Sequence, residues 1–130
     1  MNKTSRSILA VLAGFFLIGL LGFITDTILQ QLGVLPVTGT VRFKDEQSLM
    51  ALIYHLLFEV AGGYVTARLA PFRPIAHAVA LGMMGVFISI AGLFAIIQGD
   101  LAPAWYGWAL IILSIPVTWL GGRLFARGEK

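Results

Sequence analysis

The sequence predicts an all-α fold: a polytopic membrane protein built as a four-helix transmembrane bundle, with one domain over residues 1–130. Three observations lead to this prediction. Apolar residues make up 58% of the chain and charged residues only 12%, whereas a soluble domain carries about 25% charged residues. The mean hydropathy is +0.92. The apolar residues also form four continuous runs, each long enough to cross about 30 Å of hydrocarbon as a helix.

The four runs cover residues 8–29, 48–70, 75–97 and 103–125. They are continuously apolar and do not alternate, which favours helices over the strands of a β-barrel. Gly33, Pro36 and Gly39 punctuate the first connection, and Pro103 suits the start of the fourth helix. The first run follows basic residues as a signal peptide does, but it is too long for the apolar core of one, so we expect an uncleaved first helix.

The basic residues predict an orientation. One side of the membrane collects most of them: Lys3, Arg6, Arg68, Arg73, Arg123, Arg127 and Lys130. The other side has only Arg42 and Lys44. By the positive-inside rule, both termini and the short second connection are cytoplasmic, and the expected location is the plasma (inner) membrane. Trp105, Tyr106 and Trp108 then form an aromatic belt at the outer side.

Two ionisable residues, Glu59 and His55, lie inside the second run and share one helix face. A carboxylate near the bilayer centre costs roughly 2.5–3.5 kcal/mol on insertion scales, so such residues tend to mark functional sites. Asp26 lies roughly 10 Å from the midplane, on the outer half. These three residues form the candidate intramembrane polar site. The alternative is that Glu59 and His55 make a structural contact between helices.

Small residues form stripes along the predicted helices, and we expect them to be helix-packing positions. In lipid, small residues let two helix backbones approach closely. The glycines expected at such contacts are Gly19, Gly22, Gly62, Gly82, Gly85 and Gly92. The sequence also carries a faint repeat, since Gly62 to Arg68 and Gly121 to Arg127 both read Gly-Gly-x-x-x-Ala-Arg. The repeat would relate two parallel helical hairpins, although glycine is common enough in membrane helices for chance to produce it.

No catalytic, cofactor-binding or metal site is predicted. The chain has no cysteine and no motif for nucleotide binding, zinc proteolysis or nucleophilic catalysis. His55 and His77 are expected near opposite sides of the membrane, so they would not share zinc or haem. We expect His77 to face the inner headgroups beside Arg73. The basic residues flank apolar runs, which argues against nucleic acid. We therefore expect no enzyme and no cofactor.

A resemblance covers parts of the second and third runs. The segment EVAGGYVTARLAP from Glu59 to Pro71, followed by His77-Ala78 and Leu81-Gly82, resembles a segment of an uncharacterised family of small four-helix bacterial membrane proteins. The resemblance implies a multi-pass bacterial membrane protein and carries no activity with it. The chain does not resemble small multidrug exporters, whose essential glutamate lies in the first helix, where this chain has only Asp26.

Two functions from different classes fit these features. The first is a non-catalytic accessory, scaffold or assembly component of a membrane complex, which would bind other membrane subunits, or a second copy, through its glycine faces. Base rates favour this function, because four short helices enclose a narrow pathway. The alternative is a small proton-coupled transporter or channel-like protein with Glu59 and His55 as its intramembrane polar site. In both cases the helices contact the lipid bilayer.

Overall fold

The computed structural model describes residues 2–37 and 40–128, and these residues contain four helices and no strand. The helices are α1 (Lys3–Gln31), α2 (Asp45–Leu69), α3 (Pro74–Gly99) and α4 (Ala104–Gly128). All four are long and apolar enough to cross a membrane. The predicted all-α bundle is therefore confirmed, and the chain is a multi-pass membrane protein. Gly39 and Lys130, which entered the sequence predictions, lie outside the described residues.

The helices extend beyond the apolar runs because polar residues stabilise their first turns. At the start of α1, the side chain of Asn2 accepts a hydrogen bond from the backbone N–H of Ser5 at 2.8 Å. At the start of α2, the Gln47 side chain accepts one from the backbone N–H of Lys44 at 2.9 Å. Asp45 and Glu46 lie in that first turn, where negative charge favours the helix dipole. An apolar run therefore marks the hydrocarbon-spanning part of a helix rather than its ends.

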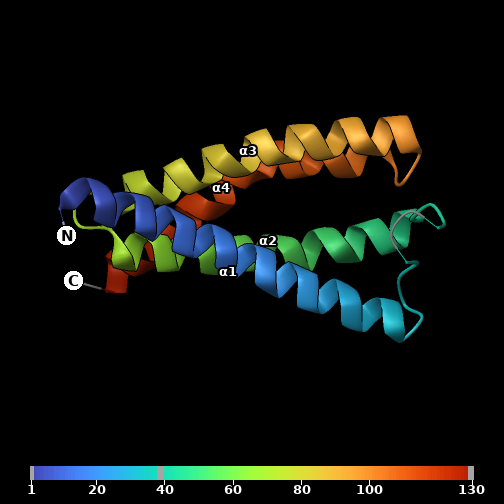
Figure 1. Cartoon of the computed structure of the whole chain (residues 1–130), viewed down its shortest axis with the longest axis horizontal. Helices are drawn as coiled ribbons and strands as arrows, with labels where there is room; N and C mark the ends of the chain where they lie inside the picture. The colour runs from blue at the N-terminus through green and yellow to red at the C-terminus, as the bar shows by residue number, and fades with distance from the viewer. Residues whose placement is uncertain (1, 38–39, 129–130) are drawn as a thin grey trace.

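The helices alternate in direction, so the bundle has two distinct ends (Figure 1). Both chain ends and the α2–α3 turn lie at one end, which we call the terminal end. The α1–α2 and α3–α4 connections lie at the other, which we call the loop end. The α1/α2 hairpin and the α3/α4 hairpin diverge toward the loop end (Figure 1). Helix α2 packs against the three other helices, whereas no Cα atom of α1 lies within 8 Å of a Cα atom of α4 over the described residues.

Close backbone contacts join the helices in the terminal half. A Cβ atom added to Gly14 of α1 would lie 2.7 Å from the carbonyl oxygen of Gly62 in α2. A Cβ atom on Gly63 would collide with the Thr118 carbonyl of α4. The Thr66 hydroxyl also donates a hydrogen bond to the Ala10 carbonyl oxygen at 2.9 Å. Glycine therefore permits α1 and α4 to approach α2 backbone to backbone, and this half of the bundle is tightly packed.

The predicted packing glycines divide into two groups. The structure places four of them within van der Waals reach of a neighbouring helix: Gly22, Gly62, Gly82 and Gly85. Gly19 and Gly92 differ from the expectation, because no atom of a neighbouring helix lies within 4 Å of the place where their Cβ atoms would stand. At 3.6 residues per turn, the ten residues from Gly82 to Gly92 rotate the second glycine about 80° away from the first. The sequence stripe therefore drifts off the contact face.

Candidate functional site

Glu59 lies on the buried side of α2, facing α4. Its side chain is 9% exposed. Its Oε1 accepts a hydrogen bond from the Ser114 hydroxyl at 3.2 Å. The same hydroxyl lies 3.1 Å from the carbonyl oxygen of Gly82 in α3. The second oxygen, Glu59 Oε2, is buried and has no hydrogen-bond partner within the described chain. One carboxylate oxygen is therefore anchored to α4, and the other is left for a partner that the protein itself does not supply.

His55 pairs with Asp26. Its Nε2 lies 3.6 Å from Oδ1 of Asp26, and the hydroxyl of Tyr54 donates a hydrogen bond to the same oxygen. The sequence suggested that His55 and Glu59 could form a contact, but the structure shows no hydrogen bond between these two side chains. Side chains of a helix lean toward its N-terminus, and the N-terminus of α2 is at the loop end, so the imidazole leans toward Asp26.

A cavity of about 310 Å³ lies between the helices beside Glu59. All four helices contribute to its wall. The polar residues of the wall are His55, Glu59, Ser89, Tyr106 and Thr118. The rest of the wall is mainly apolar and includes Gly19, which explains why that glycine has no neighbouring helix against it. The cavity thus surrounds the Glu59 carboxyl with largely apolar side chains.

A second cavity of about 170 Å³ lies at the loop end. Asp26, Gln30 and His55 line it, together with Phe43 and Leu101 from the two connections. His55 and Tyr106 belong to the walls of both cavities, so these two side chains lie between them. His55 lines one cavity together with Glu59 and the other together with Asp26. The candidate residues therefore form a series that runs inward from Asp26 through His55 to Glu59.

In the described part of the chain, an ion pair and two hydrogen bonds join the two hairpins at the loop end. The Arg42 guanidinium lies 2.9 Å from Oδ1 of Asp100. The Phe43 N–H donates a hydrogen bond to the Leu101 carbonyl oxygen at 2.9 Å. The indole N–H of Trp105 donates one to Asp45 at 2.9 Å. The Arg42 and Asp100 side chains are 48% and 81% exposed, and exposed ion pairs contribute only about 0–1 kcal/mol. The loop end is therefore held by weaker contacts than the terminal half.

Two site residues were not among the sequence candidates. Ser114 was not singled out in the fourth run, and Tyr106 was assigned to an aromatic belt. A polar pair at a spacing of four, Ser114 and Thr118, inside an apolar run was the signal that could have identified the α4 side of the site. No comparable signal separates Tyr106 from its neighbours Trp105 and Trp108, because only the bundle geometry turns it inward.

The expectation for His77 was wrong. Its side chain is buried, with 8% exposed, and it joins α3 to α1. The ring Nε2 lies 2.8 Å from the Ser7 hydroxyl, and Nδ1 lies 3.0 Å from the Arg73 carbonyl oxygen. Because a carbonyl oxygen only accepts hydrogen bonds, Nδ1 carries a hydrogen, and Nε2 of the neutral ring accepts from Ser7. Burial follows from the position of α1, which covers the first turn of α3.

The groups at the site can donate and accept hydrogen bonds, carry charge and exchange protons. Within residues 2–37 and 40–128, no three His, Cys, Asp or Glu side chains form a group that could hold a metal ion. The site contains the carboxyl groups of Asp26 and Glu59 and the imidazole of His55, which line the two cavities. No protein-family model, curated protein or solved structure matches the chain. The resemblance over residues 59–82 therefore stays a prediction, and the function has to be inferred from the geometry.

Proposed function

We propose that the chain is a small proton-coupled transporter in which Glu59 takes up and releases a proton through the loop end. The observation that carries this proposal is the position of Glu59 Oε2. This oxygen is buried and has no hydrogen-bond partner among the residues that the structure describes, and Glu59 lines the interhelical cavity. An unpartnered buried oxygen of this kind is costly. A proton on the carboxyl, or the polar group of a bound molecule, would remove that cost.

The arrangement of His55 supports a route for the proton. An imidazole can accept a proton on one ring nitrogen and release one from the other, so it can relay protons between two carboxyl groups. His55 lies between the two cavities, with Asp26 on the loop-end side and Glu59 on the inner side. Chains of Asp, Glu and His are typical of proton relays in pumps and transporters. We assign Asp26 the entry position and His55 the relay position.

The difference between the two ends supports transport rather than simple proton storage. Exposed ion-pair and loop contacts close the loop end, whereas close backbone contacts between helices close the terminal half. A pathway that opens to one side while it is closed to the other is the requirement for alternating access. Opening at the terminal end would need the two hairpins to rock about α2, and the contacts of that half would have to rearrange.

The second candidate is the accessory or scaffold component. It is supported by Gly92 of α3, which is exposed and has no neighbouring helix within 4 Å of its Cβ position. A helix of another membrane subunit, or of a second copy, could approach there closely. Under this function Glu59 is a structural contact to Ser114. For either function we propose the plasma (inner) membrane with both termini cytoplasmic, from the distribution of Lys and Arg.

Proton flux into liposomes separates the two functions. Vesicles that contain the purified chain and a trapped pH-sensitive dye are given a pH step across the membrane. A transporter moves protons, alone or together with a driven solute, and Glu59→Gln abolishes that movement. A scaffold leaves the dye signal of wild type and of Glu59→Gln equal to that of empty vesicles, and this result would contradict the proposal.

A further inference from the structure

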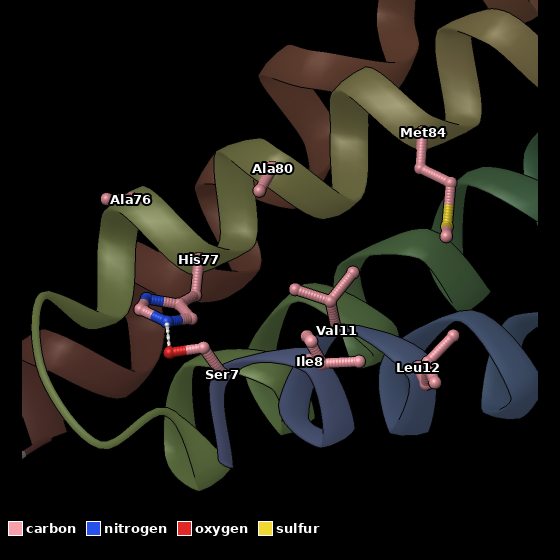
Figure 2. A pocket seen from close by; sticks show the side chains of 8 residues that line it. All are labelled: Ser7, Ile8, Val11, Leu12, Ala76, His77, Ala80 and Met84. Atoms are coloured by element: carbon pink, nitrogen blue, oxygen red, sulfur yellow. Dashed lines mark hydrogen bonds between the residues drawn. The ribbon is translucent and has the colours of Figure 1, made fainter. Parts of the chain in front are cut away.

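A groove of about 410 Å³ runs between α1 and α3 near the terminal end (Figure 2). Figure 2 shows the side chains of both helices that face it. Ser7 and His77 are the polar residues of its lining. The other lining residues are apolar: Ile8, Val11, Leu12, Ala76, Ala80 and Met84. Ile8 is 55% exposed, and Ala80 is exposed as well. The groove therefore lies on the outer surface of the bundle and is separate from the cavity at Glu59.

The groove is polar only toward the terminal end. There the Ser7 hydroxyl and the His77 ring form a hydrogen bond of 2.8 Å across the two helices (Figure 2). The apolar lining extends from this pair toward the middle of the bundle, as far as Leu12 on α1 and Met84 on α3. The order of these surfaces, apolar and then polar, matches the passage from acyl chains to headgroups in a bilayer.

Positive charge lies one helical turn beyond the polar pair. Lys3 precedes Ser7 by four residues on α1, and Arg73 precedes His77 by four residues at the start of α3. Lys3 shares a helix face with Ser7, and Arg73, the residue before the first turn of α3, has its carbonyl oxygen 3.0 Å from Nδ1 of His77, so both cations lie at the polar end of the groove. The Lys3 ammonium lies 5.8 Å from the ring centroid of Phe72, in the α2–α3 turn, which places it between the two helices. Both side chains are exposed.

No negative charge opposes these cations in the described chain. The described acidic residues lie in the cavities, at the loop end or near it: Asp26, Asp45, Glu46, Glu59 and Asp100. We propose that this groove binds one anionic phospholipid, with an acyl chain along Val11, Ala80 and Met84 and its phosphate at Lys3 and Arg73. The charge of the rim selects the anionic headgroup, and the apolar lining takes the chain. This site is independent of the proton function proposed for Glu59.

Native mass spectrometry of the full purified chain in non-ionic detergent tests the site. The probes are phosphatidylglycerol, which is anionic, and phosphatidylcholine, which is zwitterionic, with the same acyl chains. We expect tighter binding of phosphatidylglycerol. Because each Lys or Arg near a membrane surface attracts anionic lipid by an amount equivalent to about fivefold in affinity, Lys3→Gln with Arg73→Gln should weaken phosphatidylglycerol binding by about 25-fold and leave phosphatidylcholine binding unchanged.

Two matched controls keep the result specific. Arg123→Gln with Arg127→Gln removes two charges from the terminal end of α4, whose Cα atoms all lie more than 8 Å from those of α1 in the described chain, and should leave the preference intact. Ala80→Phe fills the groove and should displace both lipids, whereas Ala95→Phe, at an exposed position toward the loop end of the same helix, should displace neither. Thermal unfolding in detergent verifies that each variant is folded.

Three results would overturn the proposal. Equal affinity of wild type for the two lipids would show that the rim does not select charge. An equal loss of preference with the α4 control pair would show that only the overall charge of the terminal end acts. A dimer mass that disappears in Ala80→Phe, without any change in lipid binding, would show that the groove holds a second copy of the chain.

Discussion

The Ser114 hydroxyl lies 3.2 Å from Oε1 of Glu59 and thereby joins the carboxyl of α2 to α4. It also lies 3.1 Å from the Gly82 carbonyl of α3, so one hydroxyl of α4 contacts two other helices. The contact fixes one oxygen of Glu59 and leaves the other in the buried wall of the cavity. Because of this geometry, we propose that Glu59 exchanges a proton in addition to joining α2 to α4.

Replacing Ser114 should therefore weaken the bundle. Ser114→Ala removes the only hydrogen bond that the described chain gives to the Glu59 carboxyl, and we expect a loss of about 1 kcal/mol in the free energy of unfolding. Ser89 lines the same cavity, but the hydrogen bond to Glu59 comes from Ser114. Ser89→Ala should therefore leave the free energy of unfolding nearly unchanged. Unfolding in a mixed detergent series measures both. Equal stability of Ser114→Ala and wild type would show that the contact does not hold Glu59.

The two ends of the glycine stripe on α3 should respond differently to one methyl group. A Cβ atom on Gly82 would lie 2.8 Å from the Cα atom of Ile115, so Gly82→Ala should separate α3 from α4 and lower the free energy of unfolding by about 1–3 kcal/mol. Gly92→Ala meets open space and should leave stability unchanged or slightly raised, since alanine favours the helix. Destabilisation by both variants would indicate that a partner covers Gly92.

Asp26 should control the rate of proton entry and not the existence of the inner site. In liposomes, Asp26→Asn should slow proton flux about tenfold or more, because proton transfer by a positioned group contributes about 10²–10⁴-fold to rates. Glu46→Gln removes an exposed carboxyl from the first turn of α2, at the same end, and should have no effect. If both variants slow the flux equally, then surface charge and not the Asp26 position limits entry.

Orientation can be measured because the chain has no cysteine. Thr4 and Thr40 are both exposed and lie at opposite ends of the bundle. With both termini cytoplasmic, an impermeant thiol reagent added to intact cells should label Thr40→Cys and not Thr4→Cys. Broken cells, in which both sites are accessible, provide the control. Labelling of Thr4→Cys alone in intact cells would show that the protein has the opposite orientation. Ser48, at the same end as Thr40, is wholly buried, so a cysteine at that position would not be accessible to the reagent.

The sequence was sufficient for the fold because a bilayer imposes simple requirements. Length and hydropathy predicted four helices, and Glu59, which was singled out inside the second run, is buried in the structure together with Ser48 and Thr66 of the same helix. Those positions follow helical spacing, and in a membrane helix polar side chains face the interior of the bundle because their exposure to lipid is costly. The spacing of a single helix therefore predicted which of its faces lies inside.

The partners of those side chains could not be predicted in the same way. His55 was considered with Glu59, its neighbour along the helix, but it lies beside Asp26 of α1. Gly14 was missed although it lies against Gly62. Such contacts depend on the crossing of two helices and on the divergence of the hairpins toward the loop end (Figure 1). Neither property is encoded in the period of any one helix.

The most direct measurement of the central claim is the infrared carboxyl band of the purified protein across pH. Spectra of wild type and of Glu59→Gln are compared from about pH 4 to about pH 9, a range that includes the ordinary pKa values of a glutamate carboxyl and of an imidazole. Glutamine keeps the shape of the side chain and its hydrogen bond to Ser114, but it cannot ionise. If Glu59 exchanges a proton with the loop end, wild type shows a carboxyl band that changes with pH and that Glu59→Gln lacks. If the two series of spectra are identical, Glu59 does not titrate and the proton-coupled function is contradicted.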